Sequence, residues 1–400
     1  MKKVLSLLLA LTMAVGLLVS CGGKQEDSST STPVTPASSS EPEEPPYNPN
    51  PLTGLENDGS YTPGERLTAI MINNIAGNAA NNARPQWGIS NADILVEIKV
   101  EGGITRFMGL FSDYKSLPQV GPVRSARDQF FQLILPWEML YVHIGESTVQ
   151  TEYKTVWEYE DRDLNLDSTN FPRDQERLAT GVNREHAAYT NGEILSELVE
   201  DRGYDMNRTY NSCFFDFVNY NEPNRVLTGD DAVKIDIIHS QNYRTYFDYD
   251  AATNRYMMSQ YSAYWGKIHP TVDANNDEQL GFENVIVLFT DIHRHPNYVN
   301  DSYDIQQVEY GNGGVGYYFN GGKAEYIRWM KGAPNQVLRI LDGEGNEQSV
   351  KINPGKTYLA IVSTGEDTAG QFGYYPAETA ESTSVPEADS SAANYVDTDQ

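Results

Sequence analysis

The chain has 400 residues, which is long enough for two folded domains, and it carries 56 acidic side chains against 29 basic ones. The net charge of −27 at pH 7 excludes strong attraction to nucleic acid or to anionic lipid through surface charge. We therefore expect no nucleic-acid partner, and attachment to a membrane would need a lipid anchor.

The N-terminus has the pattern of a lipoprotein signal peptide. A basic start at Met1–Lys3 precedes an apolar run, Val4–Val19, that is too short to span a bilayer. The sequence Leu-Val-Ser-Cys-Gly at residues 18–22 resembles the lipobox of bacterial prolipoproteins. This resemblance implies that residues 1–20 are a signal peptide and that Cys21 is the lipidated mature N-terminus. Several acyl chains would anchor the protein stably on the extracytoplasmic face of the bacterial cell membrane.

Composition divides the rest of the chain into four parts. Residues 21–50 are rich in Ser, Thr, Pro and Glu, and they predict a disordered tether behind the lipidated cysteine. Residues 51–210 predict a mixed α/β N-terminal domain, and residues 211–365 predict a mainly antiparallel β C-terminal domain. Residues 366–400 predict an acidic disordered tail. The predicted fold class is therefore α+β.

The first domain shows a hairpin followed by a helix. Asp93–Val100 and Ile104–Phe111 alternate, and Gly102-Gly103 between them supplies the positive φ that a tight turn needs. Val123–Leu135 spaces its apolar residues as one helical face, with Pro122 at the first helical position. The other predicted elements are strands at Leu67–Asn73 and Met139–Ile144 and a helix at Asn191–Asp201, with Asn191 as its N-cap.

Short strands fill the second domain. They are rich in β-branched and aromatic residues and are separated by Gly, Asn and Asp turns, which is typical of an antiparallel sheet. The tyrosines predict cross-strand packing pairs, with stacking on sugar rings as the alternative. Cys213 has no disulfide partner once Cys21 is lipidated, so it is predicted to be a buried small hydrophobe. The predicted strands are 233–239, 243–249, 256–264, 283–291, 314–320, 325–330, 337–341, 349–352 and 357–363.

Several motifs together resemble the YerB-like bacterial lipoprotein family of domain of unknown function 3048. The motifs are Pro51-Leu52-Thr53-Gly54, Ile72-Asn73-Asn74, Ala83-Arg84-Pro85-Gln86, Ala92-Asp93-Ile94, Val100 to Arg106 and Gly121 to Arg127. The resemblance covers most of residues 51–365. It implies the localisation and the two-domain architecture, and it implies no catalytic residues. Residues 183–190 depart from the Pro-His-Asn-Leu-Tyr-Thr-like segment of that family, although His186, Tyr189 and Thr190 correspond.

Four arginines and a serine are the candidate ligand-binding residues: Arg84, Arg106, Arg124, Ser125 and Arg127. If a helix starts at Pro122, two of the arginines lie in its first turn, where positive charge is unfavourable unless an anion is bound. Arginine also holds carboxylates and phosphates with two parallel hydrogen bonds. The alternative is that these arginines pair within the protein, with Glu97, Glu101 and Asp128 as their partners.

Histidines offer weaker candidates for catalysis. His143 and Glu146 follow a predicted strand and could act as base and orienting group, with Ser147 as nucleophile. His186 beside Glu185 is a similar candidate, and structural roles are the alternative for both histidines. His293 and His295 could chelate a metal if they lie on a strand, but no further ligand motif accompanies them. We therefore assign no catalytic residue, no metal and no cofactor.

The sequence is best interpreted as a membrane-anchored extracytoplasmic lipoprotein without catalytic activity. Its arginine cluster would bind an anionic ligand of the cell envelope, either a cell-wall polymer or an envelope protein. Two alternatives stay open at this point. One is a hydrolase or transferase that acts on cell-envelope polymers, and the other is a structural member of an envelope complex.

Overall fold

The computed structural model describes residues 47–166, 171–298, 304–365 and 369–377. The signal peptide, the lipidation of Cys21 and nearly all of the tether were predicted for residues that lie outside these ranges. Within the described part of the chain, no helix has the length and apolar character that a bilayer crossing requires. The architecture below is therefore that of the body from Tyr47 onward.

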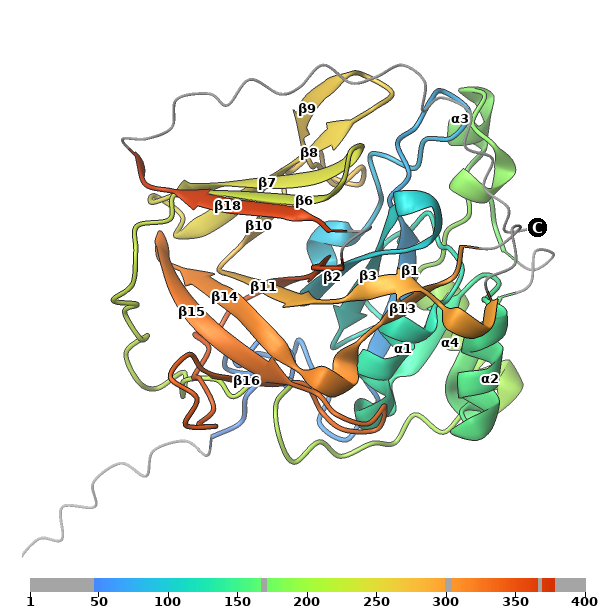
Figure 1. Ribbon diagram of the computed structural model, residues 1–400. Coiled ribbons are helices and arrows are strands. Elements are labelled where there is room, and N and C mark those ends of the chain that lie inside the picture. Colours follow the sequence, from blue (N-terminus) through green and yellow to red (C-terminus); the bar gives the residue numbers. More distant parts are fainter. Residues whose placement is uncertain (1–46, 167–170, 299–303, 366–368, 378–400) are drawn as a thin grey trace, which may run out of the picture. The chain divides into compact units, whose positions relative to one another are not determined.

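A mixed ten-stranded sheet runs through the whole body, in the order β16-β15-β14-β11-β17-β2-β3-β1-β4-β5 (Figure 1). Its central strands are buried on both faces, which explains why β1 and β17 read as continuous apolar runs. The strands are β1 Thr68–Asn73, β2 Ile94–Lys99, β3 Thr105–Phe111, β4 Leu140–His143, β5 Asp163–Asn165, β11 Asn284–Thr290, β14 Gly314–Asn320, β15 Lys323–Met330, β16 Arg339–Asp342 and β17 Thr357–Ser363.

A smaller antiparallel sheet packs against the first one, in the order β10-β8-β7-β6-β18 with β9 paired to β8. Its strand β6 alternates buried and half-buried residues, as expected for a sheet with one face on the core. The strands are β6 Lys234–Ser240, β7 Tyr243–Asp250, β8 Arg255–Ser262, β9 Lys267–Pro270, β10 Gly281–Phe282 and β18 Gln371–Tyr375, and a separate pair joins β12 Ile292–Arg294 to β13 Gln306–Val308.

Two apolar clusters fill the two faces of the large sheet. Helix α1 supplies Phe130, Phe131 and Ile134 to one cluster. Helix α4 and the smaller sheet supply side chains such as Leu195 and Phe247 to the other. The α-helices are α1 Asp128–Ile134, α2 Thr148–Val156, α3 Gln175–Ala179 and α4 Gly192–Arg202, and the 3₁₀ helices are η1 Ile89–Asn91, η2 Glu101–Gly103, η3 Leu135–Trp137, η4 Glu160–Arg162, η5 Arg184–His186, η6 Pro296–Tyr298 and η7 Tyr310–Asn312.

The α+β fold class is confirmed. One strand joins the N-terminal region, within residues 51–210, to the C-terminal region that follows it. Strand β17 comes from the C-terminal region and pairs in parallel with β2 of the N-terminal region on one side and with β11 on the other. The hairpin of β2 and β3 and the cap of α4 also agree with the sequence, because Asn191 Oδ1 accepts a hydrogen bond from the Ile194 N–H at 2.9 Å. The two regions therefore share one sheet.

The predicted helix at Val123–Leu135 is wrong at its start. Helix α1 begins at Asp128, and Arg127 before it has an extended backbone with φ −138°. The preceding segment is extended because its N–H groups bond to other segments of the same chain. The Arg124 N–H donates to the Met71 carbonyl, and the Ala126 N–H donates to the Gly145 carbonyl. The candidate residues Arg124 and Ser125 therefore do not lie in the first turn of a helix, and Arg127 is the N-cap residue of the seven-residue helix α1.

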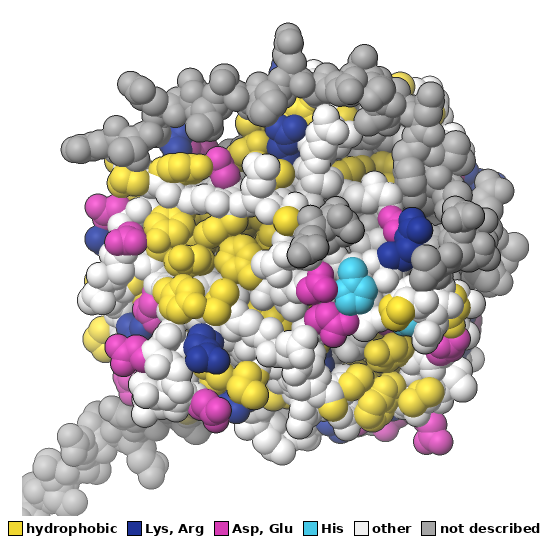
Figure 2. All heavy atoms as spheres, in the orientation of Figure 1, with side chains coloured by type: hydrophobic (Ala, Val, Ile, Leu, Met, Phe, Trp, Pro, Cys, Tyr) yellow, Lys and Arg dark blue, Asp and Glu magenta, His cyan; other side chains and the backbone are white. Residues whose placement is uncertain are grey.

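The folded body is longer than predicted at both ends. Asn50, assigned to the tether, is buried and its side chain donates to Ser112 at 2.9 Å. Strand β18 lies within the predicted tail, where Phe372 and Tyr374 pack on Tyr317. Figure 2 shows hydrophobic side chains gathered on this face, over β14 and β18. These aromatic contacts outweigh the polar composition around them, so the tail prediction is wrong for residues 371–375.

Because β17 connects the two regions, a cavity in it should destabilise the whole body. We expect Leu359→Ala to lower the free energy of unfolding by about 2–5 kcal/mol in a single transition, since Leu359 is fully buried. Urea unfolding followed by circular dichroism measures this change. The matched control is Val226→Ala, at a side chain that is 81% exposed. Two separate unfolding transitions in Leu359→Ala would contradict the shared-sheet interpretation.

Candidate ligand site between the two regions

A buried carboxylate in the centre of the large sheet organises the polar groups around it. Glu97 on β2 is fully buried in a strand whose other residues, apart from Lys99, are apolar. Its Oε1 accepts from Thr105 at 2.6 Å and from Asn74 at 3.2 Å. Its Oε2 accepts from Thr245 at 2.8 Å and from the Tyr358 hydroxyl. Four neutral donors therefore satisfy this carboxylate, and they come from both regions of the fold.

Asn74 connects Glu97 to Arg84. Its amide nitrogen donates to Glu97, so its Oδ1 faces the other way and accepts from Arg84 Nε at 2.9 Å and from Gln86 Nε2 at 3.0 Å. Arg84 Nη1 donates to the Tyr261 carbonyl at 2.8 Å. Burial lowers the pKa of Arg84, and the charge of Glu97 acts against that shift. Arg84 is thus a buried cation held in a fixed position.

Thr245 connects Glu97 to Gln260 in the same manner. The Thr245 hydroxyl donates to Glu97 and accepts from Gln260 Nε2 at 3.2 Å. Both residues lie on paired strands of the smaller sheet, at directly opposed positions of β7 and β8. Gln260 therefore presents its carbonyl oxygen on the side away from Glu97.

These side chains border a cavity of about 160 Å³ between the loop after β1 and the β8–β9 hairpin. Six of its lining residues each have a buried polar side-chain atom without a hydrogen-bond partner among the residues that the structure describes. Buried polar groups in native proteins are normally satisfied, so this concentration calls for a bound partner. The atoms are Arg84 Nη2, Gln86 Oε1, Gln260 Oε1, Ser262 Oγ, His269 Nε2 and Thr271 Oγ1.

The rim of the cavity is aromatic. Trp265, in the β8–β9 turn, is 43% exposed, and its ring lies 4.7 Å from the ring of His269. Burial and the neighbouring charge of Lys267 lower the pKa of His269, which favours the neutral imidazole. The site therefore combines one buried cation, several neutral polar groups and an exposed ring at its opening.

The other arginine candidates have partners inside the protein. Arg127 Nε lies 2.7 Å from Glu101 Oε1, so the internal ion pair considered for this cluster exists. Arg106 donates to the Ser125 carbonyl at 2.8 Å, which brings these two candidates together. Arg124 and Ser125 are both buried. Arg84 is not part of this group, because its contacts are with Asn74 and Tyr261.

His143 belongs to a buried ionic cluster. Its Nε2 lies 2.9 Å from Asp163 Oδ1, its Nδ1 lies 2.8 Å from the Gly145 carbonyl, and Glu146 is 3.9 Å away. The ligand atoms of His143, Glu146 and Asp163 lie close enough together to hold a metal ion, but the Lys154 ammonium lies within 3.0 Å of both carboxylates. Burial raises the pKa of Asp163, but His143 and Lys154 outweigh it and lower that pKa overall. The positive charge of Lys154 thus offsets the negative charges of Glu146 and Asp163.

The remaining reactive candidates also have structural contacts. Ser147 caps α2 by accepting from the Gln150 N–H. His186 is fully buried between the Asn73 and Asn81 side chains, at 3.0 and 3.3 Å. His293 lies beside two carboxylates on the β12–β13 pair. None of these arrangements presents a nucleophile next to an available base.

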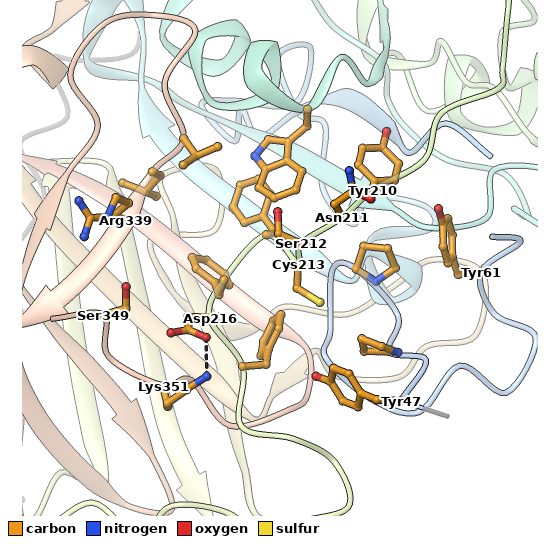
Figure 3. Close-up of a pocket in the computed structure, with 18 of the residues that line it drawn as sticks. Tyr47, Tyr61, Tyr210, Asn211, Ser212, Cys213, Asp216, Arg339, Ser349 and Lys351 are labelled. Carbon is orange, nitrogen blue, oxygen red and sulfur yellow. Dashed lines mark hydrogen bonds and ion pairs between the residues drawn. The ribbon is translucent and has the colours of Figure 1, made fainter. Parts of the chain in front are cut away.

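A larger groove of about 720 Å³ lies where the described chain begins (Figure 3). Its floor is formed by core aromatics such as Trp137 and Phe214, whose rings stack at 5.3 Å. Two of its charged groups, Lys351 and Asp216, pair at 2.6 Å, and Arg339 donates to the Glu347 carbonyl at 3.2 Å. Burial raises the pKa of the Cys213 thiol to about 11, so this cysteine is not a reactive thiolate. Among the described residues, those that line the groove have none of the unpartnered atoms that mark the smaller cavity.

Sequence reasoning found Arg84 and missed the residues opposite it. Gln86 stands in the same motif, but Gln260 and Ser262 lie far along the chain on β8, and Thr271 follows β9. A usable signal was Glu97, a single acid in a strand that otherwise reads as buried. Such a residue indicates a polar network around it.

The two regions of the fold match the two domain models of one family. Residues 52–205 match the N-terminal domain of the protein family of unknown function DUF3048, and residues 233–359 match its C-terminal domain. The chain belongs to the DUF3048 family. It is 26% identical over 317 residues to the Bacillus subtilis (strain 168) protein named "Putative lipoprotein YerB", covering 78% of this chain and 85% of the relative.

A solved structure has the same fold. The crystal structure of the YerB protein from Bacillus subtilis superposes with a TM-score of 0.62 at 23% identity, and the match covers 81% of this chain and 98% of that one. The family and this fold agree with the α+β architecture described above. The name of the relative describes that protein as a putative lipoprotein.

Asp128, considered above as an arginine partner, makes stability depend on pH. Burial raises the pKa of Asp128 from 3.8 to about 7, although Gln132 donates to it. Between these two pH values the folded state binds more protons than the unfolded state, so stability falls as pH rises through this window. We expect Asp128→Asn to be more stable than the parent at pH 8, by roughly 4 kcal/mol at most, and to lose that advantage near pH 4.

Urea unfolding at pH 4, 6 and 8 measures this difference. The matched control is Asp201→Asn, at an exposed position of α4, which should leave the pH profile of the parent unchanged. An Asp128→Asn profile that runs parallel to that of the parent would contradict the assigned titration.

Proposed function

We propose that this protein is a lipid-anchored extracytoplasmic binding protein. Its body holds a small ligand that bears a carboxylate or phosphate group, and Arg84 is the anchoring residue. The single observation that supports this most is the group of six unpartnered buried atoms around one cavity, with a guanidinium nitrogen among them. This keeps the anionic ligand inferred from the sequence and moves the site from Arg106, Arg124 and Arg127 to Arg84.

Arg84 is suited to this role because its position is fixed before a ligand binds. Three of its contacts, to the Asn74 side chain, the Asn74 carbonyl and the Tyr261 carbonyl, hold the guanidinium and leave Nη2 without a partner among the described residues. A fixed donor in a buried cavity strengthens a hydrogen bond to an anion and costs little ordering on binding. The proposal includes no catalytic step, because both nitrogens of His143 and of His186 already have contacts.

The N-terminal sequence and the named relative support the envelope location. Cys21 stands in a lipobox-like context, and the YerB homologue is named a lipoprotein. A ligand from the cell envelope or its surroundings would then reach the cavity on the outer side of the membrane.

Removal of the Arg84 side chain should weaken the binding of simple anions. Truncating one partner of a buried charged hydrogen bond costs 2–5 kcal/mol, so we expect Arg84→Gln to weaken binding of propionate or inorganic phosphate at least about thirtyfold. Isothermal titration calorimetry on the full chain measures this affinity. Arg328→Gln, at an exposed position of β15, is the control and should bind as the parent does.

A melting curve shows whether the Arg84→Gln variant is folded. If it is not, Arg84→Lys keeps the charge and removes the planar pair of donors, and it should still bind more weakly than the parent. Unchanged affinity in a folded Arg84 variant would refute the site.

The lipid anchor can be tested with the two cysteines as a matched pair. Cys21→Ser removes the residue that would be acylated, so the protein should pass from the membrane fraction to the soluble fraction of bacterial cells. Cys213→Ser should stay with the membranes, because Cys213 contacts the core and has no disulfide partner among the described residues. Fractionation followed by immunoblotting measures the distribution. Membrane retention of Cys21→Ser would refute the anchor.

A further inference from the structure

The orientation of two glutamine amides at the Arg84 cavity is fixed by their surroundings. Gln86 Nε2 lies 3.1 Å from the Asn73 carbonyl and 3.0 Å from Asn74 Oδ1, and both of these atoms only accept. Gln260 Nε2 donates to the Thr245 hydroxyl, whose own proton goes to Glu97. The unpartnered atoms are therefore the two carbonyl oxygens, which need donors from a ligand.

The charge balance of the cavity favours a neutral ligand over a free anion. Arg84 contributes one positive charge, and Glu97 contributes one negative charge on the other side of Asn74. Both are buried, so an additional unbalanced charge would be costly. A ligand that presents a carboxylate to Arg84 and a positive donor to the two glutamine oxygens satisfies both groups and adds no net charge.

We propose, on the basis of the function proposed above, that the ligand is a small α-amino acid in its zwitterionic form. Its carboxylate binds Arg84 Nη2 and its ammonium donates to the Oε1 atoms of Gln86 and Gln260. The Ser262 and Thr271 hydroxyls, which can both donate and accept, complete the lining. A volume of about 160 Å³ fits a small molecule of this kind better than a polymer chain.

A panel of four probes tests this assignment on the full chain. Alanine, lactate and propionate share a carbon skeleton and a carboxylate, and they carry an ammonium, a hydroxyl or no donor at that position; inorganic phosphate is the fourth probe. In calorimetric titrations we expect alanine to bind at least about tenfold tighter than propionate, with lactate between them, because charged hydrogen bonds contribute most.

The outcomes separate the two proposals. If propionate or phosphate binds as tightly as alanine, the amino-acid assignment is overturned and the anion site at Arg84 stands. If none of the four probes binds, the anion site is overturned as well. If the parent prefers alanine and the Arg84→Gln variant does not, the result supports both the anion site and the amino-acid assignment.

A variant pair tests the ammonium contact directly. Gln260→Leu removes one carbonyl acceptor, so it should weaken alanine binding about tenfold or more and leave propionate binding nearly unchanged. Gln279→Leu, outside the lining of this cavity, is the matched control and should keep the preference for alanine. Equal losses for alanine and propionate in a folded Gln260→Leu variant would overturn the ammonium contact. Should that variant fail to fold, the probe panel on the parent chain decides the assignment.

Discussion

The buried carboxylate of Glu97 sets the direction of the hydrogen bonds around it. A carboxylate only accepts, so Thr105, Asn74, Thr245 and Tyr358 must all donate to it. Asn74 and Thr245 then each have one accepting atom left, which the next residue outward occupies. The donors come from β3, β7, β17 and the segment after β1. One buried acid therefore links both sheets and determines which polar atoms reach the cavity.

The fold was predictable where local patterns decide it. The alternating β2–β3 pair, its Gly102-Gly103 connection and the capped helix α4 follow from periodicity, positive φ at glycine and an asparagine at the N-cap. The start of α1 was not predictable in this way. Apolar residues at Val123 and Ala126 fit a helical face, but they also fit an extended segment whose N–H groups bond to segments far away in the sequence. Strand pairing over long sequence distances, such as β17 with β2, leaves no local signal.

The site was predictable only in part, for the same reason. Arg84 was identified, but the sequence grouped it with three other arginines that lie in a different place. Arg127 forms an ion pair with Glu101, as the acidic composition suggested. The cavity depends on Gln260, Ser262 and Thr271, whose local sequence carries no chemical signature. Only the packing of the smaller sheet on the large one places these side chains opposite Arg84.

In so acidic a protein, a basic side chain pairs easily with a neighbouring carboxylate, and Arg127 and Lys154 both do so. Arg84 differs because Asn74 lies between it and Glu97. The asparagine transmits the hydrogen bond and keeps the two charges from direct contact, so the guanidinium keeps one donor without a partner among the described residues. A direct Arg84–Glu97 pair would have used that donor. The cavity also takes Arg84 from one region and Gln260 from the other, so neither region alone can form this site.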